Sequence, residues 1–142
     1  MNVATTHRLD LTDQTITYDL AGPAPGTGAA VPLVLLHGGV VDRRMWGPQL
    51  GAYPDRTVIA PDARGHGGSS DADDPYRLTD DVIRLLDALE IDRAVLAGVS
   101  MGGGTAVDTV LEHPGRVAGL VVSGTGTSEP QFTDPWMLST LA

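Results

Sequence analysis

The sequence lacks cysteine and lysine, and it is poor in aromatic residues. Without cysteine the chain can form neither disulfides nor thiolate zinc sites, and a cysteine nucleophile is excluded. All nine basic residues are arginine, and 18 acidic residues outnumber them, which leaves a net charge of −9. An acidic surface repels phosphate backbones, and an aromatic content of 4% leaves few rings for stacking on bases. Nucleic acid is therefore not an expected partner.

Long apolar runs are also missing. The runs at 31–36 and 117–122 are far shorter than the roughly 20 residues that a membrane-spanning helix needs, so we expect no membrane association. The first residues do not place an apolar segment behind a basic one, so no secretory signal is predicted. The four histidines are scattered singly, which predicts no metal site, and no cofactor is implied. Together these absences predict a soluble, cytoplasmic protein.

Apolar patterning predicts an α/β fold. Alternating residues at 7–11 and 16–20 indicate an antiparallel hairpin. Continuous apolar runs, typical of strands buried on both faces, follow at 31–36, 57–60, 94–97 and 117–122. Helices are expected between them, at 46–50, 80–90 and 101–112, and the one at 80–90 should begin with Thr79 as its N-cap. Alternating strands and helices predict a mostly parallel sheet with helices on both faces.

The most informative motif is Gly98-Val99-Ser100-Met101-Gly102, which fits the pattern G-x-S-x-G. It directly follows an expected strand and opens an expected helix, as a nucleophile elbow does. Such a turn holds the serine in a strained conformation and lifts its hydroxyl above the sheet, so Ser100 is the candidate nucleophile. Gly98 and Gly102 would let the strand and the helix approach closely. The alternative is a glycine-rich connection with a passive serine.

Two further motifs follow the strands at 31–36 and 57–60. In His37-Gly38-Gly39, the N–H of Gly39 is a candidate oxyanion donor beside the N–H of Met101. The alternative there is a tight turn in which His37 only makes structural hydrogen bonds. The segment 62–70, DARGHGGSS, gathers aspartate, arginine, histidine and serine. We interpret it as an architectural loop braced by its polar side chains and glycines, His66 included.

Taken together, HGG, DARGHGGSS, GVSMGG and HP, each after its own apolar strand, resemble the α/β-hydrolase superfamily over about residues 5–125. The resemblance implies that residues 1–125 form the N-terminal portion of an α/β-hydrolase domain and that 126–142 begin a lid or cap, or a loop segment. Ser100 stands where dehalogenases and epoxide hydrolases of this fold carry aspartate. The chain is thus most similar to serine-nucleophile members, namely arylesterases, cofactor-free haloperoxidases and enol-lactonases.

The resemblance implies a serine hydrolase that acts on a small carboxylic ester or lactone through an acyl-enzyme on Ser100. The N–H groups of Gly39 and Met101 would form the oxyanion hole, Gly98 and Gly102 would be structural, and no cofactor would be needed. A perhydrolase, the peracid-forming chemistry of haloperoxidase-like members, would use the same residues. A pseudoenzyme or non-catalytic binding module is the alternative from another functional class.

No general base or acid is evident. The family places an acid and then a histidine after the nucleophile, whereas His7, His37 and His66 all precede Ser100. His113 ends the helix that begins at Ser100, about 18 Å away along its axis. Asp134 lies well beyond the strand at 117–122. The chain is therefore expected to be C-terminally truncated relative to the family, and its apolar edge strand at 117–122 is expected to favour self-association.

The purified 142-residue chain should accordingly show negligible turnover of p-nitrophenyl acetate. Loss of a triad member costs on the order of 10⁴-fold in rate. A spectrophotometric assay of the chain and of its Ser100→Ala variant checks this. Robust turnover that depends on Ser100 would contradict the expectation and would require a base among the histidines present.

Overall fold

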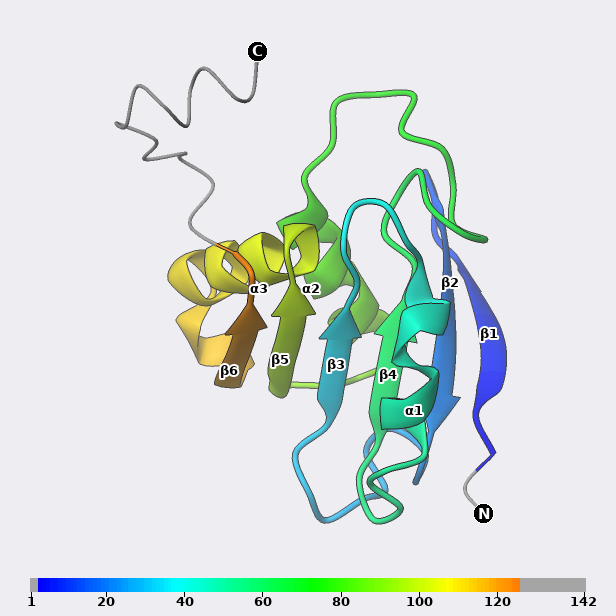
Figure 1. Ribbon diagram of the computed structural model, residues 1–142, viewed down its shortest axis with the longest axis vertical. Helices are drawn as coiled ribbons and strands as arrows, with labels where there is room; N and C mark the ends of the chain where they lie inside the picture. Colours follow the sequence, from blue (N-terminus) through cyan, green and yellow to red (C-terminus); the bar gives the residue numbers. More distant parts are fainter. Residues whose placement is uncertain (1–2, 126–142) are drawn as a thin grey trace.

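The structure, a computed structural model, describes residues 3–125. A six-stranded sheet with the order β1-β2-β4-β3-β5-β6 runs through this part of the chain (Figure 1). Its strands are β1 (Thr5–Asp10), β2 (Thr15–Ala21), β3 (Leu33–Leu36), β4 (Val58–Pro61), β5 (Ala94–Val99) and β6 (Val117–Ser123). The helices are η1 (Arg43–Trp46), α1 (Gly47–Leu50), α2 (Leu78–Ala88), α3 (Met101–Glu112) and η2 (Pro114–Arg116).

Strand directions agree with the expected fold. Strands β4, β3, β5 and β6 run parallel to their neighbours in this order. Strand β1 pairs antiparallel with β2, and β2 pairs antiparallel with β4. The mostly parallel sheet with an N-terminal antiparallel hairpin is thereby confirmed.

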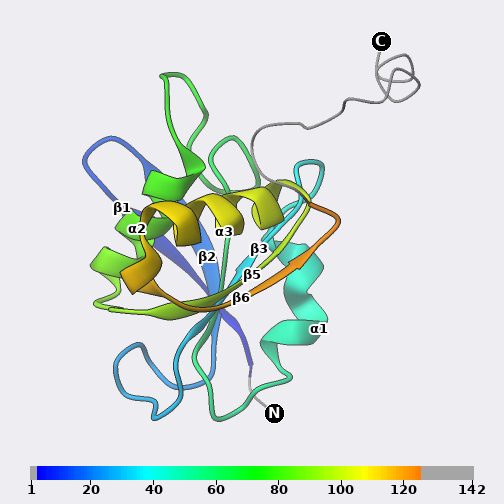
Figure 2. The same cartoon turned by 90° about the vertical axis from the view of Figure 1, so that its left-hand side faces the viewer.

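Strand β3 shows why the apolar runs are continuous. Successive side chains of a strand point to opposite faces. Val34 and Leu36 pack in the core formed with α2 and α3, whereas Leu33 and Leu35 pack in a second core with Leu50 of α1. Figure 2 shows α2 and α3 on one side of the sheet and α1 on the other. The prediction of helices on both faces is confirmed.

Helix α2 begins earlier than the sequence indicated. Its N-cap is Arg77, which makes no side-chain capping bond, and Thr79 is buried within the first turn. The prediction of Thr79 as N-cap and of a helix over 80–90 was therefore wrong by two residues at each end. Side-chain bonds from Gln14 and Arg64 to Asp81 tie this first turn to the turn between β1 and β2 and to the loop at 62–70. Tertiary contacts here outweigh the local capping preference.

The other end of α2 stops at a left-handed residue. Glu90 has a φ of 54°, and its N–H donates to the carbonyl of Asp87 at 3.0 Å. The N–H of buried Ile91 donates to the carbonyl of Leu86 at 2.8 Å. This pair of bonds is the Schellman arrangement, which satisfies the last carbonyls and directs the chain back toward β5.

Strand β6 lies at the edge of the sheet within residues 3–125, where it pairs with β5 alone. Leu120, Val121 and Val122 are exposed there, and β6 carries no charged side chain that would discourage pairing. The position of the apolar edge is as expected. Self-association through it stays a prediction.

Leu86→Ala should lower the free energy of unfolding by about 2–5 kcal/mol, because it leaves a cavity under α2 where Leu86 is fully buried. Leu111→Ala is the matched control, since Leu111 is 67% exposed and its truncation should change stability by no more than about 0.5 kcal/mol. Urea unfolding of both variants measures the difference. Equal effects would contradict the core described above.

Candidate active site

Ser100 joins β5 to α3 in a strained backbone conformation. Its φ is 52° and its ψ is −117°, and within residues 3–125 only Glu90 shares a positive φ among the non-glycine residues. Two backbone bonds hold the turn: the Ser100 N–H donates to the Ser123 carbonyl at 3.0 Å, and the Gly104 N–H donates to the Ser100 carbonyl at 2.9 Å. The residue is nevertheless exposed. The expected strand–turn–helix elbow is present.

The glycines around Ser100 occupy positions with no room for a side chain. A Cβ on Gly98 would lie 2.3 Å from the carbonyl oxygen of Gly102. A Cβ on Gly102 would lie 2.2 Å from the carbonyl oxygen of Leu36 on the neighbouring strand. Both obstacles are backbone atoms, so they cannot move aside as a flexible side chain would. These two glycines allow the start of α3 to rest on β3 and β5.

The loop after β3 lies directly over the elbow. A Cβ on Gly38 would lie 3.8 Å from Cβ of Ser100, and one on Gly39 would lie 3.7 Å from Cβ and Sδ of Met101. Met101 is the first residue of α3, so its N–H has no acceptor within the helix. No backbone hydrogen bond of the turns and loops in residues 3–125 starts from the N–H of Gly39 or Met101. The structure thus brings the two candidate oxyanion donors together.

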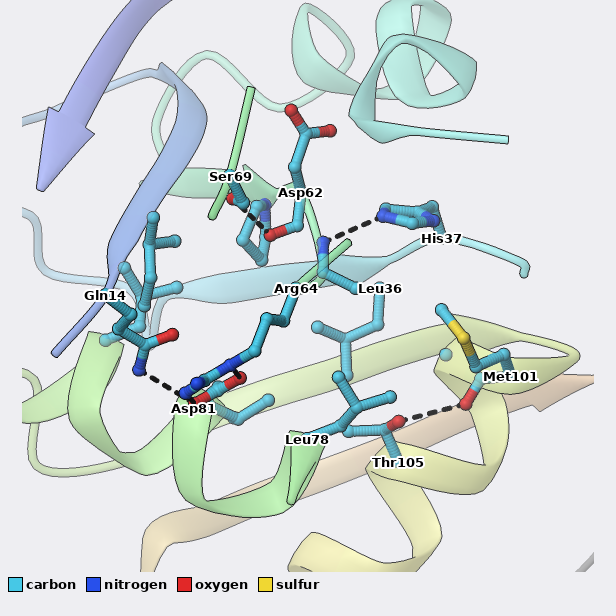
Figure 3. A pocket seen from close by; sticks show the side chains of 16 residues that line it. Gln14, Leu36, His37, Asp62, Arg64, Ser69, Leu78, Asp81, Met101 and Thr105 are labelled. Carbon is cyan, nitrogen blue, oxygen red and sulfur yellow. Dashed lines mark hydrogen bonds and ion pairs between the residues drawn. The ribbon is translucent and has the colours of Figure 1, made fainter. Parts of the chain in front are cut away.

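His37 is buried, 2% exposed, and both of its ring nitrogens are used. Nε2 accepts the N–H of Ala63 at 2.9 Å, so the ring proton sits on Nδ1 and is donated to the carbonyl of Gly38 at 2.7 Å (Figure 3). That carbonyl shares a trans peptide with the N–H of Gly39, and the two point in opposite directions. His37 therefore turns the Gly39 N–H away from its own ring, which fits the structural alternative for this histidine.

His66 bridges the loop at 62–70 and the loop after β3. Its Nδ1 lies 3.0 Å from the carbonyl oxygen of Arg64, and its Nε2 lies 2.8 Å from that of Gly39. The ring is 5.0 Å from the ring of His37, centroid to centroid. His66 thus touches the backbone of a candidate oxyanion residue, a contact that the sequence did not predict.

None of the four histidines forms a hydrogen bond with Ser100. His7 lies on β1 and stacks on Tyr18 of the hairpin. His113 follows the last residue of α3, at the end remote from Ser100, as expected. The candidate acid Asp134 lies outside the described residues. Residues 3–125 therefore hold a candidate nucleophile and oxyanion donors without a base in contact.

Asp62 anchors the loop after β3. Its fully buried carboxylate accepts the backbone N–H of Arg43 at 2.8 Å, the Arg43 guanidinium at 2.6 Å and the N–H of Gly68 at 2.8 Å. Arg43 also pairs with Asp19 of β2. Burial alone would lower the pKa of Arg43, but the hydrogen bonds that Arg43 donates to Asp19 and Asp62 raise it above its usual value. The architectural interpretation of 62–70 agrees with these contacts.

The sequence did not predict a second buried ion pair, between Arg64 and Asp81. Asp81 of α2 accepts Nη2 of Arg64 at 2.7 Å and Nε2 of Gln14 at 2.7 Å (Figure 3). The hydrogen bond to Asp81 raises the pKa of Arg64, and its guanidinium also lies over the ring of Tyr76. A signal was available, because Asp81 falls on the apolar face of α2, four residues before Leu85. A carboxylate in such a stripe needs a buried partner.

A small cavity of about 40 Å³ lies between α2, the start of α3 and the sheet (Figure 3). Its apolar wall is formed by Ile16, Leu36, Leu78, Val82, Leu85 and Met101. Ser100 does not line it. Ligand pockets usually exceed about 300 Å³, so this cavity alone is too small to hold a substrate.

Two other features were sought in the part of the chain that the structure describes. No group of three or more histidine, aspartate or glutamate side chains there could hold a metal ion. None of its helices is both long and apolar enough to cross a membrane.

Gly98→Ala and Gly102→Ala should each lower the free energy of unfolding by about 3 kcal/mol, because the new methyl group meets backbone. Gly115→Ala is the control: nothing lies within 4 Å of a Cβ there, so the change should stay within about 0.5 kcal/mol. Urea midpoints of the three variants test this. If the elbow variants were as stable as Gly115→Ala, the close packing of α3 on β3 and β5 would be refuted.

Known proteins resemble this chain in sequence and structure. It is 40% identical over 113 residues to the 2-hydroxymuconate semialdehyde hydrolase of Pseudomonas sp. (strain CF600), covering 73% of this chain and 40% of that protein. It is 41% identical over 85 residues to 3-oxoadipate enol-lactonase 2 of Acinetobacter baylyi, covering 57% of this chain and 32% of that protein. The crystal structure of the enol-lactonase from Burkholderia xenovorans LB400 matches with a TM-score of 0.73 and 34% identity, over 80% of this chain and 45% of that one.

The chain therefore spans less than half the length of these relatives, which confirms that it is short relative to its homologues. A family model for the α/β hydrolase fold matches residues 31–142. With this match, the sheet order and the relatives in agreement, the chain belongs to the α/β-hydrolase family.

Proposed function

We propose that this chain carries the nucleophile and the oxyanion hole of a serine hydrolase that acts on a carboxylic ester or lactone. The observation that carries the proposal is the positive φ of exposed Ser100 at the start of α3. Backbone strain of this kind costs about 1–3 kcal/mol and is retained at functional sites. The ψ of −117° also takes Ser100 outside the left-handed helical region in which turn and cap residues with a positive φ usually lie.

In the proposed reaction, Oγ of Ser100 attacks the carbonyl carbon of the substrate and its proton passes to a general base. The carbonyl oxygen becomes an oxyanion, which collapses to an acyl-enzyme as the alkoxide leaves with a proton. For a lactone the ring opens, and the alcohol stays attached to the acyl group. Water then attacks the acyl-enzyme and releases the acid.

The oxyanion would be held by the N–H groups of Gly39 and Met101. The loop that carries Gly39 packs against Met101, and the start of α3 adds the positive end of its helix dipole. Preorganised donors of this kind are worth on the order of 10²–10³ in kcat each.

The general base and its acid partner are proposed to come from outside residues 3–125. All four histidines make other contacts or lie remote from the elbow. A lid or cap beginning at 126–142 is part of the same proposal, and that segment lies outside the described residues. The names of the lactonase relatives support a lactone or ester as substrate.

Ser100→Ala should reduce hydrolysis of p-nitrophenyl acetate by about 10⁴-fold or more in an extended protein, in which residues 1–142 continue to the length of the relatives. The melting temperature should hardly change, because alanine keeps the strained backbone. Ser100→Gly should be equally inactive and about 1 kcal/mol more stable than Ser100→Ala, since glycine adopts a positive φ without strain. Esterase assays and thermal unfolding provide both measurements.

Near wild-type turnover by the Ser100→Ala variant would contradict the proposed role of Ser100 as the nucleophile. Perhydrolysis is distinguished in the same assay by adding hydrogen peroxide and following peracid formation. Substrate binding without any turnover in the extended protein would favour the non-catalytic binding module.

A further inference from the structure

The contact between His66 and Gly39 connects the loop at 62–70 to the candidate oxyanion hole. Nε2 of His66 lies 2.8 Å from the carbonyl oxygen of Gly39, across 27 residues of chain. A carbonyl oxygen only accepts, so this contact is a hydrogen bond in the tautomer that carries the ring proton on Nε2; Nδ1 faces a second carbonyl oxygen, that of Arg64, and accepts nothing there. This contact is not needed to satisfy a buried group, because the pair lies near the surface.

Gly39 lies between two peptide planes, and a histidine holds each of them. His37 donates to the carbonyl of Gly38, which sets the plane that contains the Gly39 N–H. His66 donates to the carbonyl of Gly39 itself, which sets the following plane. Glycine has wide backbone freedom, so these bonds restrict rotations that a side chain would otherwise limit. The N–H of Gly39 belongs to the first plane, and the bond from His66 restricts rotation of the second plane about Cα of Gly39.

Contacts within the loop at 62–70 hold the backbone and the ring of His66 in place. Its backbone N–H donates to the carbonyl of Ala63 at 3.0 Å, and its own carbonyl accepts the N–H of Ser69 at 3.1 Å. The carbonyl of Arg64 lies 3.0 Å from Nδ1, and the side chain of Arg64 is paired with buried Asp81. The imidazole therefore projects from a rigid loop toward Gly39.

We propose that His66 is a positioning residue of the oxyanion hole: through its Nε2–H it orients the backbone of Gly39 for the transition state. The inference rests on the proposed function and revises the purely architectural interpretation of His66. It assigns His66 no role as general base, because Nε2 is committed to Gly39 and the ring has no hydrogen bond with Ser100.

The two ring nitrogens allow a matched pair of variants. The amide nitrogen of glutamine reaches roughly the position of Nε2, so His66→Gln can still donate to Gly39. The amide nitrogen of asparagine stops near Nδ1, so His66→Asn keeps the contact with Arg64 and loses the one with Gly39. Both variants carry an uncharged amide side chain, so they differ mainly in its length.

In the extended protein, His66→Asn should lower kcat about 10- to 100-fold with KM within about twofold of wild type. A misdirected N–H donor would weaken stabilisation of the transition state more than binding of the substrate. His66→Gln should keep kcat within about threefold. Melting temperatures of the two variants should match. The ¹³C shift of the Gly39 carbonyl, measured by NMR, should move in the asparagine variant and stay near the wild-type value in the glutamine variant.

Equal kcat values for the two variants, or losses that follow the folded fraction, would overturn the positioning role and leave His66 purely structural. That failure is distinct from failure of the proposed function. If the wild-type extended protein shows no turnover that depends on Ser100, the proposed function fails, and the role of His66 in it fails as well.

Discussion

The close approach of three backbone segments, β3, β5 and the start of α3, is the constraint on which the rest of the site depends. At Gly102 the helix backbone is so near β3 that a Cβ would lie 2.2 Å from the carbonyl of Leu36. This approach brings Met101 under Gly39 and places the start of α3 beside the loop that leaves β3. A larger residue would push α3 away from the sheet, and the two candidate donors would separate with it.

Charged and polar side chains hold the second loop, 62–70, against this arrangement. The carboxylate of Asp62 accepts hydrogen bonds from the backbone N–H and the guanidinium of Arg43. Nε2 of His37 accepts the N–H of Ala63. Breaking a buried pair such as Arg43 and Asp62 leaves an uncompensated charge, which typically costs about 3–5 kcal/mol. The loop after β3 therefore has little freedom, although it is rich in glycine. Rigid support of this kind is what a preorganised oxyanion hole requires.

The fold and the elbow could be predicted from the sequence because their causes are local. Apolar runs identified the strands, and the residues around Ser100 combine a strand end, small neighbours and a helix start. The start of α2 could not be predicted from capping rules, because Asp81 is fixed by partners distant in the chain. The contact of His66 with Gly39 was missed for the same reason. It spans two loops whose relative position exists only after β3 and β4 have paired.

The contacts around Ser100 explain how its strained backbone conformation is maintained. A positive φ in serine costs about 1–3 kcal/mol and persists only where neighbouring contacts leave no alternative. Here the N–H of Ser100 is bound to β6 and its carbonyl receives the N–H of Gly104. The glycines on either side allow β5, α3 and β3 to approach closely enough for these bonds to form. Contacts within the described residues thus offset the free energy of the strained backbone at Ser100. A base from elsewhere in the protein would complete the site.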